Sequence, residues 1–353
     1  MSLELKNVTK RVGAQTYIYE TNLKLEDGSL NVLLGATLAG KTTLMQLMAG
    51  LEKPTSGEVW FRGVNVTGVP VQKRNVSMVY QQFINYPNFS VRDNIAAPLR
   101  VARMSEEEVE KRVKKAAELL RLTPMLDRKP SQLSGGQQQR TAIARAIVKD
   151  SDIILFDEPL ANLDYKLREE LRDELPKLFA ERNCIVVYAT TEPAEALLFG
   201  GNTATLHEGR ITQFGPTSQG YRLPRDLTSA QVFSDPPINI HNAVKSGQHL
   251  KLADGPQWTL TKEPAIADGE YTIAVRPHHV TPRSPGAGAG IVEGRVLITE
   301  LSGSESVIHF SLGGKTWVSQ SHGISPVEVG ASTRLYVDTT QILYYKPNGE
   351  LAA

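Results

Sequence analysis

Two patterns of apolar and polar positions divide the chain. Up to about residue 220, short apolar runs alternate with stretches of helical periodicity, which favours an α/β domain with a largely parallel sheet. The runs 31–34, 153–156 and 185–188 are short and almost wholly apolar, as core strands are. The first leads into a Gly-rich turn, after which a helix is predicted from about Thr42.

A helical subdomain is predicted over about 85–150. Ser105 and Glu108 have the spacing of a capping box, which predicts the start of a helix. The apolar residues that follow fall on one face of that helix, namely Val109, Val113, Ala116 and Leu120.

The pattern of apolar and polar residues changes at about Asp235. Gly- and Pro-rich turns such as 285–290 separate short alternating strands, which are predicted at 271–275, 292–301, 307–311, 335–338 and 342–345. This pattern is typical of a small all-β, barrel-like module of the OB kind. A chain of 353 residues is also too long for one compact core. We therefore expect two domains, 1–234 and 235–353.

Composition excludes some classes of protein. Lys plus Arg number 39 and Asp plus Glu 38, so a formal charge of +1 argues against a nucleic-acid partner. The single Cys184 lies in an apolar run, which fits a reducing cytosol and excludes an intramolecular disulfide. The start at Met1 lacks a signal-peptide pattern, and the apolar runs fall far short of the roughly 20 residues that span a bilayer. Any action at a membrane is expected to be peripheral.

The Gly-rich turn after the first strand matches the P-loop pattern. Backbone N–H groups of such a loop surround the phosphates of a nucleotide, the Lys41 cation reaches the β- and γ-phosphates, and the Thr42 hydroxyl is a Mg²⁺ ligand. Taken alone, the motif also fits a turn that only caps a helix. The residues expected to contact nucleotide are Gly35, Ala36, Thr37, Leu38, Ala39, Gly40, Lys41, Thr42 and Thr43.

Two further motifs remove that ambiguity. In the run Leu133-Ser134-Gly135-Gly136-Gln137, Ser134 and Gln137 form a capping box, and the glycines leave backbone N–H groups uncovered at a helix N-terminus, which binds an anion. About twenty residues on, a strand ends in two carboxylates. Because adjacent residues of a strand point in opposite directions, Asp157 is expected near Mg²⁺ and Glu158 beside the attacking water.

These motifs, in this order and spacing and together with Gln81 and Asp164, resemble the ATP-binding cassette (ABC) ATPases over about residues 3–220. The resemblance implies a P-loop NTPase fold, hydrolysis of ATP with Mg²⁺, and a head-to-tail pair of cassettes. ATP would lie between the P-loop of one cassette and residues 133–137 of the other, with Asp164 at the seam. Gln81 would reach Mg²⁺ and report to residues 82–87, which would touch the membrane subunits.

The rest of the chain resembles one branch of that family. The stretches 86–95 and 162–168 and the element Arg276-Pro277-His278-His279 are similar to the ATPase subunits of maltose and glycerol 3-phosphate importers, which carry a C-terminal β-barrel regulatory domain. The nearest likeness is to glycerol importers, which use two different ATPases. A metal site at the paired histidines is the less favoured alternative. The implied partners are a second, different cassette, two transmembrane permease subunits and a solute-binding protein, at the cytoplasmic face of the cell membrane.

Three positions depart from the family pattern. Thr191 stands where the switch histidine is usual, Val12 where an aromatic residue stacks on adenine, and Leu38 where the loop usually has glycine. Tyr17 or Tyr19 are candidates to replace the aromatic residue. The departures fit either drift that leaves activity intact or a weakened site in this chain.

Two other functions remain as alternatives. One is a regulatory nucleotide-binding subunit that does not hydrolyse ATP, which Glu158 argues against. The other is a soluble cassette ATPase that acts on DNA or ribosomes, which the single cassette and the near-neutral charge disfavour. The sequence leaves the transported solute open, and we expect a sugar, a polyol or a glycerol-type compound.

Overall fold

The computed structural model describes residues 2–82, 84–180, 182–286 and 288–353. The chain forms two compact units, Met1–Ser218 and Gln219–Ala353. The boundary therefore lies before the expected 234/235. The physical reason is that the buried Arg276 donates hydrogen bonds to the backbone oxygens of Tyr221 (2.6 Å) and Phe233 (3.4 Å), which ties residues 219–234 to the β module. Thr217, by contrast, bonds to Thr203 and Gly200 in the first unit.

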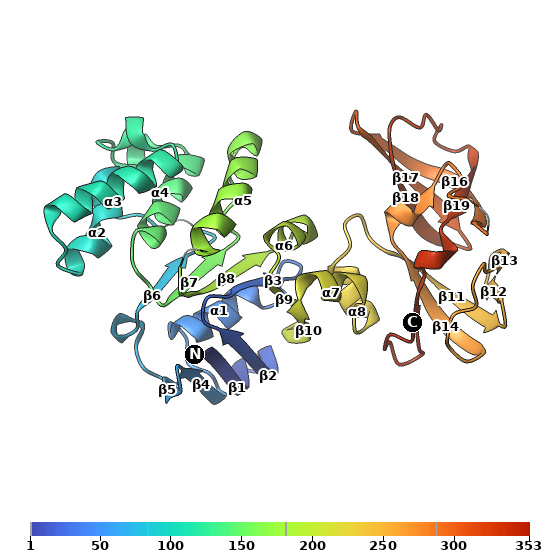
Figure 1. Ribbon diagram of the computed structural model, residues 1–353, viewed down its shortest axis with the longest axis horizontal. Helices are drawn as coiled ribbons and strands as arrows, with labels where there is room; N and C mark the ends of the chain where they lie inside the picture. The colour runs from blue at the N-terminus through green and yellow to red at the C-terminus, as the bar shows by residue number, and fades with distance from the viewer. Residues whose placement is uncertain (1, 83, 181, 287) are drawn as a thin grey trace. The chain divides into compact units, whose positions relative to one another are not determined.

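A six-stranded sheet forms the centre of the first unit, with the order β10-β9-β3-β8-β7-β6 (Figure 1). All neighbours are parallel except β9 and β10, so the mainly parallel sheet predicted from the sequence is confirmed. The carboxyl ends of β3, β7 and β8 consequently meet at one edge. The bounds are β3 Leu30–Leu34, β6 Val76–Val79, β7 Ile153–Asp157, β8 Ile185–Thr190, β9 Asn202–His207 and β10 Arg210–Pro216.

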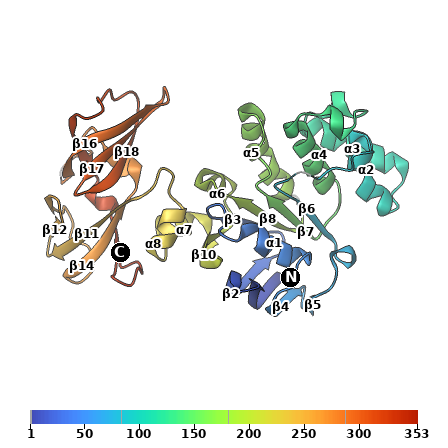
Figure 2. The ribbon, with the colours of Figure 1, turned by 180° about the vertical axis from the view of Figure 1, so that it is seen from behind.

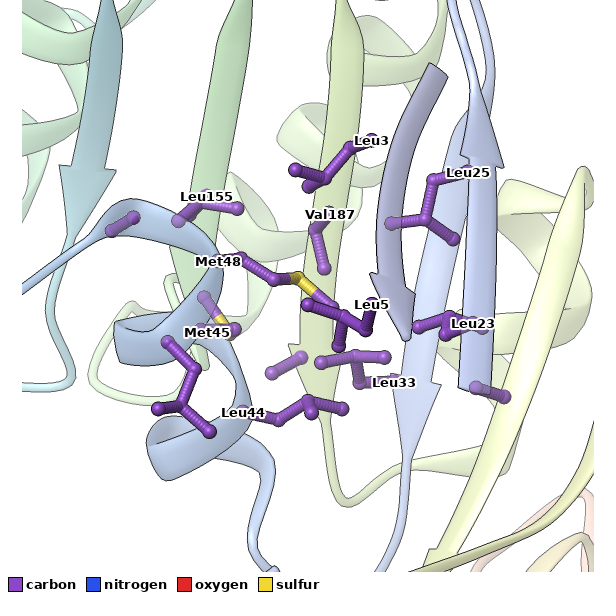
Figure 3. Packing of buried hydrophobic residues seen from close by; sticks show 14 of the residues in the cluster. Leu3, Leu5, Leu23, Leu25, Leu33, Leu44, Met45, Met48, Leu155 and Val187 are labelled. Atoms are coloured by element: carbon purple, nitrogen blue, oxygen red, sulfur yellow. The ribbon is translucent and has the colours of Figure 1, made fainter. Parts of the chain in front are cut away.

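A second, antiparallel sheet has the order β2-β1-β4-β5. Its strands are β1 Ser2–Val12, β2 Gln15–Glu26, β4 Ser56–Phe61 and β5 Val64–Asn65. Helix α1, Lys41–Ala49, packs between the two sheets (Figure 3). Its Leu44, Met45 and Met48 are completely buried, against a cluster that includes Leu3, Leu5, Leu23, Leu25, Leu33, Leu155 and Val187. Each such side chain contributes roughly 1.5–3 kcal/mol on burial, so the helix that starts at Lys41 is firmly held.

The helices α2 Val91–Val101, α3 Glu106–Leu119 and α4 Gly135–Ile147 lie together, apart from the antiparallel sheet (Figures 1 and 2). Ser105 caps α3, accepting from the Glu108 N–H (3.4 Å), and the predicted apolar face is buried. The Glu108 carboxylate, however, pairs with Arg112 (2.8 Å), where the capping box would have turned it back to Ser105. The other helices are α5 Tyr165–Ala180, α6 Pro193–Phe199, α7 Thr217–Arg222 and α8 Leu227–Val232, with 3₁₀ turns at Val71–Lys73, Thr123–Met125, Pro130–Gln132, Pro277–His279 and Thr339–Gln341.

The β module has two five-stranded antiparallel sheets, β13-β12-β11-β14-β20 and β15-β19-β16-β17-β18, around one apolar core. The fold class predicted from the sequence is thus confirmed. Strands β11, β12, β13, β15 and β18 were not predicted. Strands β12, β13 and β15 span only two to four residues, and the buried face of β11 carries the polar Asn239, His241 and Lys245. The bounds are β11 Asn239–Ser246, β12 His249–Leu252, β13 Gln257–Thr259, β14 Gly269–Val275, β15 Val280–Thr281, β16 Gly290–Leu301, β17 Glu305–Leu312, β18 Lys315–His322, β19 Ser332–Val337 and β20 Leu343–Tyr345.

A fragment that ends at residue 218 should unfold cooperatively and bind nucleotide within about threefold of the full chain, since its core is self-contained. Thermal unfolding and titration with a fluorescent ATP analogue measure both properties. A folded fragment that no longer binds nucleotide would contradict the division into units. A fragment that ends at 234 is the comparison, and it should be less soluble because it carries residues that pack in the second unit.

Candidate functional site

The loop 35–40 joins β3 to α1 at the edge where the parallel strands end. At two positions of this loop, neighbouring atoms lie so close to the backbone that only glycine fits. A Cβ on Gly35 would lie 2.5 Å from the Leu206 backbone oxygen, and one on Gly40, whose φ is 104°, would lie 2.9 Å from Ile18 Cδ1. The Gly35 N–H also donates to the backbone oxygen of Thr190 at the end of β8 (3.3 Å). The loop is therefore held against neighbouring strands on both sides.

The Lys41 ammonium group lies inside this loop, with only 5% of the residue exposed. Its Nζ donates to the backbone oxygens of Gly35 (2.8 Å) and Ala36 (3.1 Å) and lies 3.2 Å from Glu158 Oε1. A buried cation needs such acceptors, because an unpaired charge in the interior is strongly unfavourable. The cation is thus held beside the backbone N–H groups that open α1, where an anionic group would bind.

The two carboxylates after β7 face different partners. Asp157 Oδ2 accepts from the Thr42 hydroxyl (2.7 Å), whereas Glu158 contacts Lys41 and accepts from Gln81 Nε2 (3.2 Å). Burial raises the pKa of Asp157 above its usual range, and the bond from Thr42 opposes that shift. Such a buried carboxylate favours a cation close by. The structure thus brings together Lys41, Thr42 and Gln81 with this acidic pair.

Glu158 also has a backbone feature that the sequence did not reveal. Its φ is 47°, in the left-handed region, and its N–H donates to the backbone oxygen of Ala189 on β8 (3.0 Å). A residue other than glycine in this region costs about 1–3 kcal/mol, and such strain clusters at functional sites. The neighbouring strand therefore fixes the orientation of Glu158.

Residues 133–137 lie at the N-terminus of α4. Ser134 caps this helix with both halves of the predicted capping box: its N–H donates to Gln137 Oε1 (3.0 Å), and its hydroxyl accepts from the Gln137 N–H (3.4 Å). A Cβ on Gly136 would lie 3.3 Å from the Asn162 backbone oxygen, so the loop before Asp164 packs tightly here. Asp164 itself accepts from the Leu167 N–H (3.0 Å) at the start of α5. In the described parts of the chain, no hydrogen bond or ion pair joins residues 133–137 to Lys41, Asp157 or Glu158.

The three positions that depart from the family pattern, Val12, Leu38 and Thr191, are all exposed. Leu38 is 95% exposed and has a φ of 68°, so the position does require the left-handed region, at a cost of about 1–2 kcal/mol for a leucine. Val12, 58% exposed, ends β1, and Thr191 lies in the turn after β8. Tyr17 and Tyr19 on β2 are partly exposed, and the Arg210 guanidinium stacks on the Tyr19 ring (3.6 Å).

The loop after Gln81 presents apolar side chains. Ile84, Tyr86 and Phe89 are exposed, and Phe83 lies outside the described residues. The loop is fixed from beneath by the fully buried Asn94, whose side chain donates to the backbone oxygens of Tyr86, Phe89 and Ser90 and accepts from the Tyr86 N–H. This clamp was not predicted, because a single asparagine within a helix carries no recognisable signal.

The Arg276-Pro277-His278-His279 element forms a 3₁₀ turn. Burial, with a contribution from His278, lowers the pKa of His279 to about 4, so this imidazole is neutral at physiological pH. Across the described residues, no group of three or more His, Cys, Asp or Glu side chains is arranged to hold a metal ion. Over the same residues, no helix is both long enough and apolar enough to cross a bilayer.

Comparison with known proteins identifies the family. Residues 18–161 match the ABC transporter family model. The chain is 34% identical to the trehalose/maltose import ATP-binding protein of Thermococcus litoralis, covering 99% of this chain and 98% of the other. It is 35% identical to the sn-glycerol-3-phosphate import ATP-binding protein of Yersinia enterocolitica (97% and 96% covered). It is also 35% identical to the alpha-glucoside transport ATP-binding protein of Rhizobium meliloti (99% and 98% covered).

Solved structures agree. A dimeric ATP-binding cassette in a post-hydrolysis state with ADP and phosphate is 32% identical, with a TM-score of 0.56, over 61% of this chain and 98% of that one. The chain therefore belongs to the ABC transporter family, as an ATP-hydrolysing subunit of the carbohydrate importer type.

Replacing Lys41 by alanine should weaken nucleotide binding by about 10- to 100-fold, since a charge-assisted hydrogen-bonding group is worth about 1.5–3 kcal/mol. Titration with a fluorescent ATP analogue measures this loss. Lys177→Ala, which removes an exposed cation paired with Glu174, is the matched control and should leave affinity unchanged. Equal affinities in the two variants would contradict the role of the loop.

Proposed function

We propose that this chain is one member of an unequal pair of cassettes that drives uptake of a sugar, polyol or glycerol-type solute. The supporting observation is positional. Val12, Leu38 and Thr191 all belong to the side of the chain that would hold its own nucleotide, whereas Ser134 retains both halves of its capping box at the helix end that would serve the partner. Two copies of this chain would have two impaired sites, whereas a different partner would restore one.

In the proposed own site, ATP phosphates bind the backbone N–H groups of loop 35–40 and the Lys41 ammonium group. Mg²⁺, when bound, would neutralise phosphate charge. The donor set fits this ion, because the Thr42 hydroxyl lies against the Asp157 carboxylate and hard oxygen ligands suit magnesium. Gln81 supplies a further amide oxygen. Glu158, fixed by its contacts with Lys41 and Gln81, would orient the attacking water.

The proposed weakness comes chiefly from Thr191. A threonine hydroxyl cannot replace an imidazole that positions the reacting groups, and losing such a group typically costs about 10²–10⁴ in rate, or roughly 3–5 kcal/mol of barrier. Because Glu158 keeps its partners, we favour slow hydrolysis at this site over the second candidate, a regulatory subunit with no hydrolysis. That second candidate rests on Thr191 alone.

The proposed assembly has four kinds of subunit. A second cassette would pair head to tail with this one, so that residues 133–137 and Asp164 complete its ATP site. The dimeric form of the solved relative supports only the association of two cassettes. Two permease subunits would dock on the loop that presents Ile84, Tyr86 and Phe89. A solute-binding protein would deliver the solute from outside, while this chain stays at the cytoplasmic face without nucleic-acid partners. The relatives named above import trehalose or maltose, sn-glycerol 3-phosphate or alpha-glucosides, which supports the solute class.

Ser134→Arg should abolish most ATP turnover of the reconstituted importer, because a bulky cation would fill the helix end that completes the partner's site. Ser105→Arg is a matched control, since it removes a serine cap with the same 3.4 Å bond from another helix. Glu158→Gln should have a much smaller effect than Ser134→Arg. Equal losses from Ser134→Arg and Glu158→Gln, or full activity of this chain as a homodimer, would refute the unequal pair.

Thr191→His should raise ATP turnover of the complex by up to about twofold, because the restored ring would let the weak site add its turnover to that of the partner's site. Thr191→Ala is the control and should not. A histidine variant no faster than the alanine variant would show that Thr191 does not limit this site.

A further inference from the structure

Next to Thr191 lies a buried carboxylate that no step above uses. Glu195, on the short helix α6, is only 4% exposed. Its Oε2 accepts from the Thr190 hydroxyl (2.6 Å) and the Tyr188 hydroxyl (3.1 Å), and its Oε1 accepts two bonds from the Arg172 guanidinium, each of 3.2 Å. Both oxygens of the carboxylate are therefore held by donors on two other elements, strand β8 and helix α5.

The negative charge of Glu195 is paired with the Arg172 cation, which it shares with two other carboxylates. Arg172 is nearly buried, and it also bonds to Glu169 (2.5 Å) and to Glu192 in the turn that follows Thr191. Burial, followed by the nearby Glu195 carboxylate, raises the pKa of Tyr188 well above its usual range, which keeps the phenol protonated as a donor. A buried carboxylate with four donors is charge-assisted and specific in geometry, so the parts it joins have little freedom to move.

The network fixes the carboxyl end of β8, and the backbone of this strand end contacts the candidate nucleotide site. Tyr188 and Thr190 point to the Glu195 side of the strand, as alternate residues do. The backbone oxygens of Ala189 and Thr190, in turn, accept the N–H groups of Glu158 (3.0 Å) and Gly35 (3.3 Å). A shift of this strand end would therefore move the carboxylate and the start of the phosphate loop together.

We propose that Glu195 is a positioning residue for ATP hydrolysis, which fixes the end of β8 so that Glu158 and Gly35 keep their places at the nucleotide. The proposal rests on the function proposed above for Glu158 and the loop. Glu195 touches neither nucleotide nor water in this scheme, and its effect passes through Thr190 and Tyr188. A displacement of about 1 Å at a reacting group can cost on the order of 10² in rate, so such an indirect role is sufficient to matter.

Glu195→Gln is the sharpest change, because it keeps the shape and removes the charge. Only the Arg172 guanidinium is an obligate donor, so the glutamine oxygen must face it, and the NH₂ group then turns the Thr190 and Tyr188 hydroxyls from donors into acceptors. The negative charge opposite Arg172 is lost in either orientation of the amide. Asp152→Asn is the matched control. It removes a carboxylate paired with Arg62 (2.8 Å) at the opposite, amino ends of the same strands.

The first measurement is amide hydrogen exchange of the full-length chain, which does not depend on hydrolysis. We expect the N–H groups of Gly35 and Glu158 to exchange about tenfold faster in Glu195→Gln than in the unmodified chain, and Asp152→Asn to leave them unchanged. Unchanged protection of both amides in Glu195→Gln would overturn the proposal. Thr190→Val should reproduce the effect and Thr190→Ser should not, because only serine retains the hydroxyl.

The second measurement is ATP turnover of the reconstituted importer in the Thr191→His background. There Glu195→Gln should remove most of the gain in kcat that Thr191→His brings, with an unchanged KM for ATP, since the partner's site keeps turning over and the loop would still bind nucleotide. A kcat equal to that of the Asp152→Asn control would overturn the proposal. If Thr191→His itself brought no gain, the unequal pair would fail instead, and amide exchange would still decide the role of Glu195.

Discussion

The parallel pairing of β8 with β3 on one side and β7 on the other is the constraint on which the rest of the site depends. In this register Leu34 lies opposite Thr190, and Asp157 lies opposite Ala189. Strands that run in the same direction end at the same edge, so the phosphate loop, the acidic pair and the Thr191 turn all begin within two residues of each other. The chemistry is assembled by backbone hydrogen bonds before any side chain contributes.

The side chains at this edge are fixed by charge as well as by packing. Lys41 is buried among backbone oxygens and Glu158, and α1 behind it is anchored by Leu44, Met45 and Met48 in the core. Two backbone positions, Leu38 and Glu158, lie in the left-handed region at the mouth of the site. Strain of this kind persists only where the surroundings hold it, and here the buried helix and strand β8 do so.

The residues proposed to complete the partner's ATP site lie elsewhere in the same unit. Ser134 and Gln137 shape the start of α4, and Asp164 shapes the start of α5, without a bond to the Lys41 cluster among the described residues. The two halves are built on different elements. A change in one need not disturb the other, so the proposed weak site of this chain is compatible with the proposed intact contribution to its partner.

The sequence by itself determined the local features. The strand at 31–34, the loop that ends at Lys41, the cap at Ser134 and the apolar face of α3 depend on short-range periodicity and hydrogen bonding, which neighbouring residues encode. The sequence also placed Asp157 and Glu158 on different partners, because side chains alternate along a strand. It misplaced the domain boundary, since residues 219–234 are helical yet pack with the β module through Arg276.

Tertiary structure alone decided how these pieces act on one another. The left-handed backbone at Glu158 comes from its bond to Ala189, a residue 31 positions away on another strand. The burial of Glu195 beneath Thr190 and Arg172, and the clamp of Asn94 on the loop before α2, likewise join residues whose polar character is ordinary in sequence. The identity of a polar residue does not reveal whether its side chain faces water or belongs to a buried network. Only the packing of the surrounding elements removes the water that would otherwise form its hydrogen bonds.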